Sequence, residues 1–287
     1  MSADTPLRFS RRRAGAVTLH VAEAGPESGP LVILLHGFPE FWFGWRHQID
    51  ALAAAGYRVV APDQRGYNLS DKPAGVAAYD LDPLASDIVA LADSYGAKNF
   101  ALVGHDWGAG VAWWVAQNHP RRVRKFAILN APHPAIWRTA MDQDPEQRKL
   151  SWYVRVLGVP ALPEFGIRAG RYRGLLAALR ESKRALGDDE EAQYLTAWRQ
   201  EGALTAMINW YRAVLRRRDF APPPEASIEP PAAIIWGAKD RYSALKFAEK
   251  SAALCTRADL TVLAEATHWV QHDEAERVNG ILLDFLK

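Results

Sequence analysis

Short apolar runs alternate with amphipathic stretches along much of the chain. The strand-like runs lie at 31–35, 57–61, 99–103, 125–129, 232–236 and 259–263. The stretches with helical periodicity lie at 44–55, 82–95 and 273–285. Buried strands that alternate with helices are typical of a mostly parallel sheet covered by helices. We therefore expect an α/β fold, in which Asp82 is the N-cap of the 82–95 helix.

The alternation stops in the middle of the chain. From about His133 to Pro224 there is no strand-like run, only helical periodicity rich in Arg, Ala, Leu, Trp and Tyr. The prolines at 222–224 end this block, and strands resume at 232. We predict one α/β core domain, made of residues 1–132 and 225–287, with an all-helical cap domain inserted at 133–224.

Composition excludes several other classes of protein. The chain has 287 residues, 49% of them hydrophobic, and a net charge of +2. Its arginine runs, Arg11–Arg13 and Arg216–Arg218, are short enough to be solvated surface, so we expect no nucleic-acid partner. No apolar stretch is long enough to span a bilayer, so we expect no membrane partner. One cysteine, Cys255, and a polar N-terminus without a signal-peptide core predict a cytoplasmic protein.

A candidate nucleophile follows the 99–103 strand directly. Gly104-His105-Asp106-Trp107-Gly108 joins this strand to a helix, as does the nucleophile elbow, a tight turn that lifts one side chain above the sheet. The turn needs flanking residues without bulky β-carbons, which Gly104 and Gly108 satisfy. Its central residue must tolerate positive φ, and aspartate does so better than most. We predict Asp106 as the nucleophile.

Two further residues complete a candidate catalytic triad. Asp240 follows the strand that ends near Trp236, and His268 follows the 259–263 strand. The chain order of Asp106, Asp240 and His268 is the nucleophile–acid–base order of α/β-hydrolases. Because each member follows a strand, we expect all three at the carboxyl edge of the sheet.

An aspartate at the elbow changes the chemistry that the triad supports. A carboxylate attacks an electrophilic carbon that bears a leaving group and becomes an alkyl ester, which His268 then hydrolyses by activating water. The backbone N–H groups of Phe38, in the loop after the 31–35 strand, and of Trp107 are the expected oxyanion hole. The substrate carbon must then carry either a strained oxygen or a halide.

With these residues the chain resembles a microbial epoxide hydrolase of the α/β-hydrolase superfamily, in the branch with an aspartate nucleophile. The motifs that carry the resemblance are HGFPE at 36–40, DQRGY at 63–67, GHDWGAG at 104–110, WGAKD at 236–240 and THW at 267–269. Relatives often have glycine where this chain has Asn68, but asparagine also accepts positive φ, so we expect the turn to survive. The resemblance implies an inserted helical cap and epoxide hydrolysis to a vicinal diol.

The resemblance also implies two cap tyrosines that hydrogen-bond the epoxide oxygen. One family tyrosine precedes a proline-containing turn, which Tyr153 matches ahead of Pro160. The other lies in a motif resembling Asn-Trp-Tyr-Arg, which 209–212 matches with Tyr211. A phenol, with an ordinary pKa of about 10, is a neutral donor near pH 7. We therefore predict Tyr153 and Tyr211 as proton donors.

Two alternatives stay open. Haloalkane and fluoroacetate dehalogenases share the elbow, and a haloalkane dehalogenase needs N–H donors for the departing halide. Trp107 supplies one, but Phe38 stands where an asparagine often supplies the other, so a cap tryptophan would have to replace it. Fluoroacetate dehalogenases typically have arginine in place of Trp107. The other alternative is a ligand receptor with this fold and little turnover.

The expected substrate is a small, neutral, lipophilic epoxide, which reacts with water. A mainly apolar pocket favours such substrates, and we predict its lining to be Phe38, Trp107, Leu157, Met207, Trp210 and Trp269. The sequence has no metal-ligand spacing, so we expect no cofactor and no metal. A homodimer is compatible with the sequence.

Overall fold

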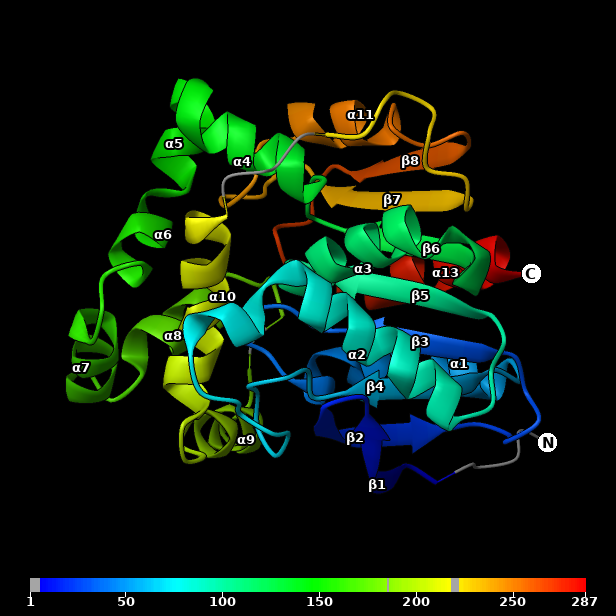
Figure 1. The fold of residues 1–287 in the computed structure, drawn as a ribbon, viewed down its shortest axis with the longest axis horizontal. Coiled ribbons are helices and arrows are strands. Elements are labelled where there is room, and N and C mark those ends of the chain that lie inside the picture. The colour runs from blue at the N-terminus through cyan, green and yellow to red at the C-terminus, as the bar shows by residue number, and fades with distance from the viewer. Residues whose placement is uncertain (1–5, 185, 218–221) are drawn as a thin grey trace.

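An eight-stranded sheet forms the centre of the computed structural model, which describes residues 6–184, 186–217 and 222–287 (Figure 1). Its strand order is β1-β2-β4-β3-β5-β6-β7-β8. The pairs β1–β2 and β2–β4 are antiparallel, and β3 to β8 pair in parallel. The strands are β1 (Arg8–Ala14), β2 (Val17–Ala24), β3 (Leu31–Leu35), β4 (Arg58–Pro62), β5 (Phe100–His105), β6 (Val123–Leu129), β7 (Ala232–Gly237) and β8 (Ala258–Leu263).

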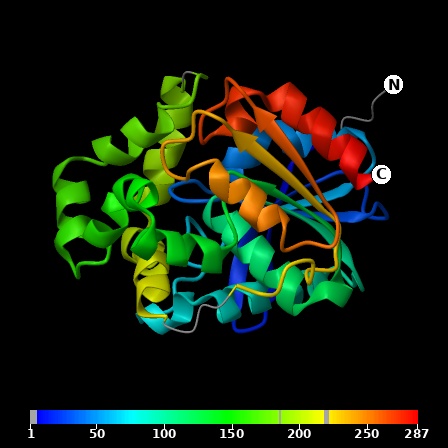
Figure 2. The ribbon, with the colours of Figure 1, turned by 90° about the horizontal axis from the view of Figure 1, so that it is seen from above.

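Helices cover both faces of this sheet, as Figure 2 shows. One face packs against α2 (Leu81–Ser94), α3 (Trp107–Asn118) and α11 (Lys246–Ala252). The other packs against α1 (Arg46–Ala54) and α13 (Ala275–Leu286), next to the short α12 (Val270–Asp273). The 3₁₀ turns are η1 (Trp42–Trp45), η2 (Val76–Tyr79) and η3 (Pro120–Arg122). The central strands β3, β5 and β7 are buried along their whole length because helices cover both of their sides, whereas β8 at the sheet edge is only partly buried.

The helical insertion lies between β6 and β7, at the carboxyl ends of the parallel strands (Figure 1). Its helices are α4 (Pro134–Gln143), α5 (Pro145–Leu150), α6 (Trp152–Leu157), α7 (Leu162–Ala169), α8 (Arg173–Leu179), α9 (Asp188–Trp198) and α10 (Ala203–Arg216). The structure has the predicted mostly parallel α/β sheet with a helical insertion. The domain bounds 133–224 stay a prediction. Residues 1–5, 185 and 218–221 lie outside the described residues, and they include Arg218 of the second arginine run.

All six predicted strands occur, but the sequence analysis missed β1 and β2. β1 is an edge strand with several exposed side chains, and it carries the arginine run Arg11–Arg13. Its charged residues hide the alternation that marks a half-buried strand, although charges on an edge strand are a common protection against aggregation. The predicted helix at 44–55 divides into η1 and α1.

The predicted N-cap Asp82 was wrong by two residues. Asp80 caps α2, because its side chain accepts a hydrogen bond from the Leu81 N–H. Asp82 lies in the first turn instead, where its carboxylate accepts a hydrogen bond from Trp114 Nε1 at 2.7 Å. The helix can begin before Pro83 because a proline in the first turn removes no intrahelical hydrogen bond. Asn68, by contrast, has the expected positive φ, of 40°.

None of the helices in the described part of the chain combines the length and hydropathy that a membrane-spanning segment requires.

Candidate active site

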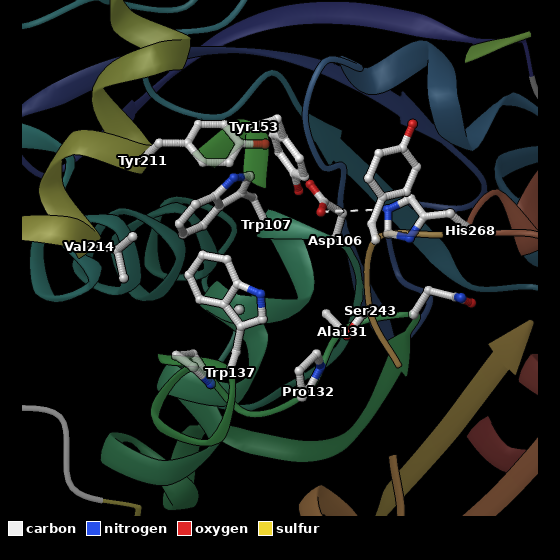
Figure 3. A pocket seen from close by; sticks show the side chains of 14 residues that line it. Asp106, Trp107, Ala131, Pro132, Trp137, Tyr153, Tyr211, Val214, Ser243 and His268 are labelled. Atoms are coloured by element: carbon white, nitrogen blue, oxygen red, sulfur yellow. Dashed lines mark ion pairs between the residues drawn. The ribbon is translucent and has the colours of Figure 1, made fainter. Parts of the chain in front are cut away.

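Three strand ends bring the predicted triad together beneath the cap. Asp106 follows β5, Asp240 lies three residues after β7, and His268 lies in the loop after β8. Because β5, β7 and β8 run in parallel, their carboxyl ends share one edge of the sheet. The close-up in Figure 3 shows Asp106 and His268 side by side, with Trp107, Tyr153 and Tyr211 around them.

The turn that presents Asp106 is sterically tight. Asp106 has φ 50° and ψ −120°, outside the main allowed regions for a side-chain-bearing residue. A β-carbon on Gly104 would approach the carbonyl oxygen of Gly108 to 2.4 Å, and one on Gly108 would approach that of Leu35 to 2.1 Å. Both glycines are therefore required for α3 to start this close to β3 and β5. This geometry agrees with the predicted elbow.

The triad side chains lie within reach of one another. His268 Nδ1 lies 2.9 Å from Asp240 Oδ2, and because a carboxylate only accepts, Nδ1 carries the proton. The other ring nitrogen, Nε2, then faces Asp106, with 3.6 Å between it and Oδ2. Asp240 also accepts hydrogen bonds from two backbone N–H groups, those of Tyr242 at 2.7 Å and Ser243 at 3.0 Å.

Charge and burial set the protonation states of this group. Burial lowers the pKa of His268, but the carboxylates of Asp240 and Asp106 outweigh that effect and raise it to about 10. Burial raises the pKa of Asp106, but the His268 imidazole and the Phe38 N–H outweigh it, and the net shift is downward. At neutral pH the resting site therefore holds an imidazolium between two carboxylates.

One of the two predicted oxyanion-hole donors already contacts the nucleophile. The Phe38 N–H donates to Asp106 Oδ1 at 2.8 Å. Trp107 is the first residue of α3, where a backbone N–H has no partner within the helix. Among the described contacts its N–H makes no hydrogen bond to the resting carboxylate, so its role stays a prediction.

A small pocket opens above the triad and includes both predicted cap tyrosines. Its volume is about 60 Å³. A buried water needs roughly 10–15 Å³ of such volume, so the cavity has space for a few waters or a small substrate. Its walls are mainly apolar and come from Asp106, Trp107, Gly110, Asn130, Ala131, Pro132, Pro134, Trp137, Tyr153, Tyr211, Val214, Tyr242, Ser243 and His268. The Tyr153 and Tyr211 rings meet nearly at right angles, with centroids 6.0 Å apart.

Of the six predicted pocket residues, only Trp107 lies in this lining. Leu157, Met207, Trp210 and Trp269 are packed into the hydrophobic core instead. The two tryptophans use their ring nitrogens there, since Trp210 donates to the Arg65 carbonyl and Trp269 to the Ala178 carbonyl.

The geometry of α10 explains part of this correction. Most of this helix is buried, and only the strip with Tyr211 and Val214, three residues apart, reaches the pocket. Phe38 lies behind Tyr211, against which it packs edge to face with centroids 5.2 Å apart. Its backbone therefore contacts Asp106 while its ring supports the tyrosine.

The sequence analysis missed Asn130, which follows β6. Its Nδ2 donates to Asp240 Oδ2 at 2.6 Å, and its Oδ1 accepts from the Gly237 N–H at 3.0 Å. Asn130 thus connects the Asp240 carboxylate to the end of β7. Its backbone has a positive φ of 50°. A polar residue directly after a parallel strand was the available signal, the same one that identified Asp106.

Two aromatic residues of the pocket were also missed. Tyr242 packs against the His268 ring at 4.9 Å and against Tyr153 at 5.8 Å, measured between centroids. Trp137 comes from α4 and packs edge to face on Trp107 at 5.9 Å. Neither residue lies in a motif that singles it out from other aromatic residues of the chain.

A buried polar network is hydrogen-bonded to the loop that contains His268. The His105 ring donates from Nε2 to the His268 carbonyl at 2.9 Å, since its Nδ1 accepts from Gln271 Nε2. The carboxylate of Glu40 receives hydrogen bonds from Tyr194, His272 and Gln271. Burial raises the pKa of Glu40, but His272 and His105 outweigh it and hold the pKa well below its usual range. Within the described residues, no group of three His, Cys, Asp or Glu is arranged to hold a metal.

Comparisons with known proteins agree with this architecture. The sequence profile described as alpha/beta hydrolase fold matches residues 30–275. AB hydrolase superfamily protein YfhM of Bacillus subtilis is 44% identical over 94% of this chain and 95% of that protein. Epoxide hydrolase 4 of Mus musculus is 34% identical over 97% of this chain and 79% of the mouse protein. A crystal structure of the Bacillus megaterium epoxide hydrolase with an inhibitor has a TM-score of 0.87 and 31% identity, covering 96% of this chain and 99% of that one.

The strand order, the elbow and the profile match define a class: the chain belongs to the α/β-hydrolase fold family. Within that family it is closely related to the epoxide hydrolases over nearly its full length.

The charge balance of the site can be measured directly. In Asp106→Asn, one of the two anions beside His268 is lost, so the pKa of His268 should fall from about 10. An opposite charge at this range shifts a pKa by about 1–3 units, which sets the expected decrease. NMR titration of the imidazole, assigned by its loss in His268→Gln, measures it. The control is Asp284→Asn, which removes an exposed carboxylate near the C-terminus and should leave the His268 pKa unchanged. An unchanged His268 pKa in Asp106→Asn would contradict the ion pair between Asp106 and His268.

Proposed function

We propose that this protein is an epoxide hydrolase, which opens epoxides to vicinal diols through an alkyl ester on Asp106. The observation that carries the proposal is the placement of two phenols, Tyr153 and Tyr211, in the same small pocket as Asp106 and His268. They come from α6 and α10, while Asp106 and His268 come from the core. A substrate between the two groups would meet a nucleophile on one side and O–H donors on the other.

The electrostatics favour phenols that stay protonated. Burial, with the negative charge of Asp106, raises the pKa of Tyr153 well above its ordinary value. Burial also raises that of Tyr211, with the neighbouring Tyr153 and Asp106 adding to the effect. Both hydroxyls are therefore neutral donors at neutral pH, which suits stabilisation of an epoxide oxygen as it becomes an alkoxide.

In the first half-reaction, Asp106 attacks the less hindered epoxide carbon. Its Oδ1 is held by the Phe38 N–H, which leaves Oδ2 to form the new C–O bond as the epoxide C–O bond breaks. A tyrosine hydroxyl protonates the departing oxygen, and the imidazolium of His268 restores that proton. His268 is then neutral, as a general base must be.

In the second half-reaction, His268 takes a proton from water, which attacks the ester carbonyl carbon. Esterification has removed the charge of Asp106, so one of the two anions that raise the pKa of His268 is gone. The N–H groups of Phe38 and Trp107 stabilise the tetrahedral oxyanion. Its collapse releases the diol, protonated by His268, and the resulting carboxylic acid of Asp106 returns a proton to His268. The triad is then in its starting state.

A relative supports the choice of substrate class. A variant of the Bacillus megaterium epoxide hydrolase, 31% identical to this chain, was solved with its product, a naphthyloxy-propanediol. The pocket of the present chain has mainly apolar walls and a small volume, which favours a small, neutral, lipophilic epoxide here as well.

A dehalogenase is the second candidate, and one observation favours it. Trp137 of the cap lies in the pocket beside Trp107, and it is a cap tryptophan of the kind that could replace the missing halide donor. The epoxide proposal is preferred because two neighbouring phenols, Tyr153 and Tyr211, line the same small pocket as Asp106 and can supply two O–H donors to a ring oxygen. The ligand-receptor alternative predicts binding without turnover, and any multiple-turnover assay distinguishes it.

The two-step scheme predicts a trapped intermediate in His268→Gln. This variant keeps the nucleophile and both tyrosines, whose hydroxyls supply the proton of the ring opening, but it lacks the base of the second half-reaction. Substrate should therefore alkylate Asp106, and product should not be released. Intact-protein mass spectrometry should find one added substrate mass, and peptide mapping should place it on Asp106. Asp106→Asn with His268→Gln is the control and should gain no mass. An unmodified His268→Gln protein, under conditions where the wild type turns over, would falsify the scheme in which an ester on Asp106 forms before His268 acts as a base.

Tyrosine substitutions separate epoxide opening from dehalogenation. Tyr153→Phe and Tyr211→Phe should each lower the rate of diol formation by about 10²–10³, since losing a donor to a developing oxyanion costs roughly 3–4 kcal/mol. Tyr172→Phe, a buried cap tyrosine outside the pocket lining, is the matched control and should keep its activity. The assay compares styrene oxide with haloalkanes and fluoroacetate. Full diol formation by both variants, or halide release faster than diol formation by the wild type, would favour the dehalogenase.

Isotope labelling distinguishes covalent catalysis from direct hydrolysis. In a single turnover with enzyme in excess in ¹⁸O-water, one Asp106 oxygen leaves with the diol and the solvent oxygen enters the carboxylate. The diol should be unlabelled, and the peptide that contains Asp106 should carry ¹⁸O. His268→Gln, which stops at the ester, is the control and should release no diol. Labelled diol and unlabelled enzyme after one turnover would mean that Asp106 acts only as a general base.

A further inference from the structure

The outer side of the cap carries an unusually apolar surface. Its five large side chains on α6, α7 and the turn between them are 42–73% exposed, and we call this surface the cap face: Trp152, Val156, Val159, Leu162 and Phe165. A monomeric soluble protein seldom exposes so many large apolar residues in one place. An exposed apolar surface of this kind usually marks a contact with another protein or with a membrane.

The residues of the cap face share one side of their helices. Trp152, Val156 and Val159 follow helical spacing along α6 and its end, while Val154 and Leu157 are buried beneath them. Leu162 and Phe165 repeat the pattern one turn apart on α7, which contacts α6. In Figure 1, α6 and α7 lie at the end of the cap that is farthest from the sheet. The cap face thus looks away from the core domain.

Positive charge surrounds these apolar residues. The segment 148–180 contains seven Lys or Arg residues and a single carboxylate, Glu164. The whole chain has a net charge of only +2, so the remainder of the chain is net negative. Glu164 is buried and forms an ion pair with Arg212 of α10 at 2.7 Å, so it does not neutralise the surface.

Four of the basic residues lie on α6, on α7 or in the segment from the end of α7 to the start of α8, and all four are exposed: Arg155, Arg168, Arg171 and Arg173. Within the described residues, none of these four forms an ion pair with a carboxylate. Exposed arginines without acidic partners, next to a tryptophan and a phenylalanine, match the chemistry of a surface that binds anionic lipid.

We propose that the cap face docks on the surface of an anionic phospholipid bilayer, with Trp152 and Phe165 in the interfacial region and the surrounding arginines against the headgroups. A second copy of this chain fits the cap face less well, because a self-complementary contact would bring the same unpaired arginines together. The sequence analysis expected no membrane partner because it found no spanning segment, which does not bear on peripheral binding. Docking is a property of the cap surface and does not depend on the proposed reaction.

The inner side of the same helix connects this surface to the pocket. Tyr153, next to Trp152, lines the pocket, so α6 has one side toward the active site and the other toward the bilayer. Lipophilic compounds concentrate in bilayers, and docking would hold the pocket close to them.

Vesicle flotation of the full chain, without substrate, tests the proposal. Vesicles of equal parts phosphatidylglycerol and phosphatidylcholine should carry the protein, whereas phosphatidylcholine alone should carry much less. Binding should weaken as salt rises from about 0.01 M to 0.15 M, because the Debye length falls from about 30 Å to about 8 Å. Binding that is equal on both vesicles and insensitive to salt would contradict the role of the arginines.

Paired variants locate the binding surface. Two double variants should each lower the apparent affinity more than ten-fold: Leu162→Ser with Phe165→Ser, and separately Arg168→Gln with Arg171→Gln. For the arginine pair this follows because one basic residue near an anionic surface contributes about five-fold. The first pair removes apolar side chains from the interfacial region. Val262→Ser, on β8, and Arg121→Gln with Arg124→Gln, at the amino end of β6, are exposed controls away from the cap and should bind like the wild type. Circular dichroism checks that every variant is folded.

Three results would overturn the proposal. The first is no binding of the wild type to anionic vesicles, and the second is wild-type affinity in both the apolar pair variant and the arginine pair variant. The third is a wild type that is dimeric by light scattering without vesicles but monomeric when it carries Leu162→Ser and Phe165→Ser, because the cap face would then be a contact between copies. Asp106→Asn should bind vesicles like the wild type, so a failure of the proposed reaction and a failure of docking remain distinguishable.

Discussion

The buried imidazole of His268 lies between two carboxylates, and the chemistry of the site depends on this arrangement. Asp240 contacts one ring nitrogen at 2.9 Å, and Asp106 faces the other at 3.6 Å. Two anions around one cation leave a net negative charge in a largely buried site, which favours a nucleophilic carboxylate. The same charges make His268 a poor base until one of them is removed. In the proposed mechanism, esterification removes the charge of Asp106, so the first step prepares the base for the second.

This arrangement depends in turn on backbone geometry that few residues permit. Asp106 has positive φ, and the glycines beside it have no room for a β-carbon. Asn130, also with positive φ, reaches across from β6 to hold the second carboxylate. Strain of this kind is retained where the surrounding structure fixes it, as the buried parallel strands do here. The rigid sheet edge thus sets the distances between groups that come from distant parts of the chain.

Sequence reasoning was successful where a residue has a local steric or periodic signature. The six parallel strands, the helical insertion and the turn at Asp106 follow from apolar runs, proline and glycine positions. It failed for β1, whose arginines hide its alternation, and for the pocket lining, where Trp210 and Trp269 are core residues. Whether an aromatic residue on a helix faces a cavity or the core depends on how helices pack, and no pattern within one helix records that. The position of Asn130 directly after a strand was a signal in the sequence, but its partner Asp240 becomes evident only when the strands are placed side by side.

The hydrogen bond from Phe38 to Asp106 explains why an aspartate at this elbow favours alkyl over acyl chemistry. In a serine enzyme the oxyanion hole is free to receive the carbonyl oxygen of the substrate. Here the Phe38 N–H already holds one oxygen of the nucleophile itself. A substrate carbonyl would have to displace that oxygen, whereas a saturated carbon needs only the other oxygen, Oδ2. In the proposed mechanism, the carbonyl oxygen of the ester is the one that Phe38 holds, so the hole is in place for water attack without rearrangement.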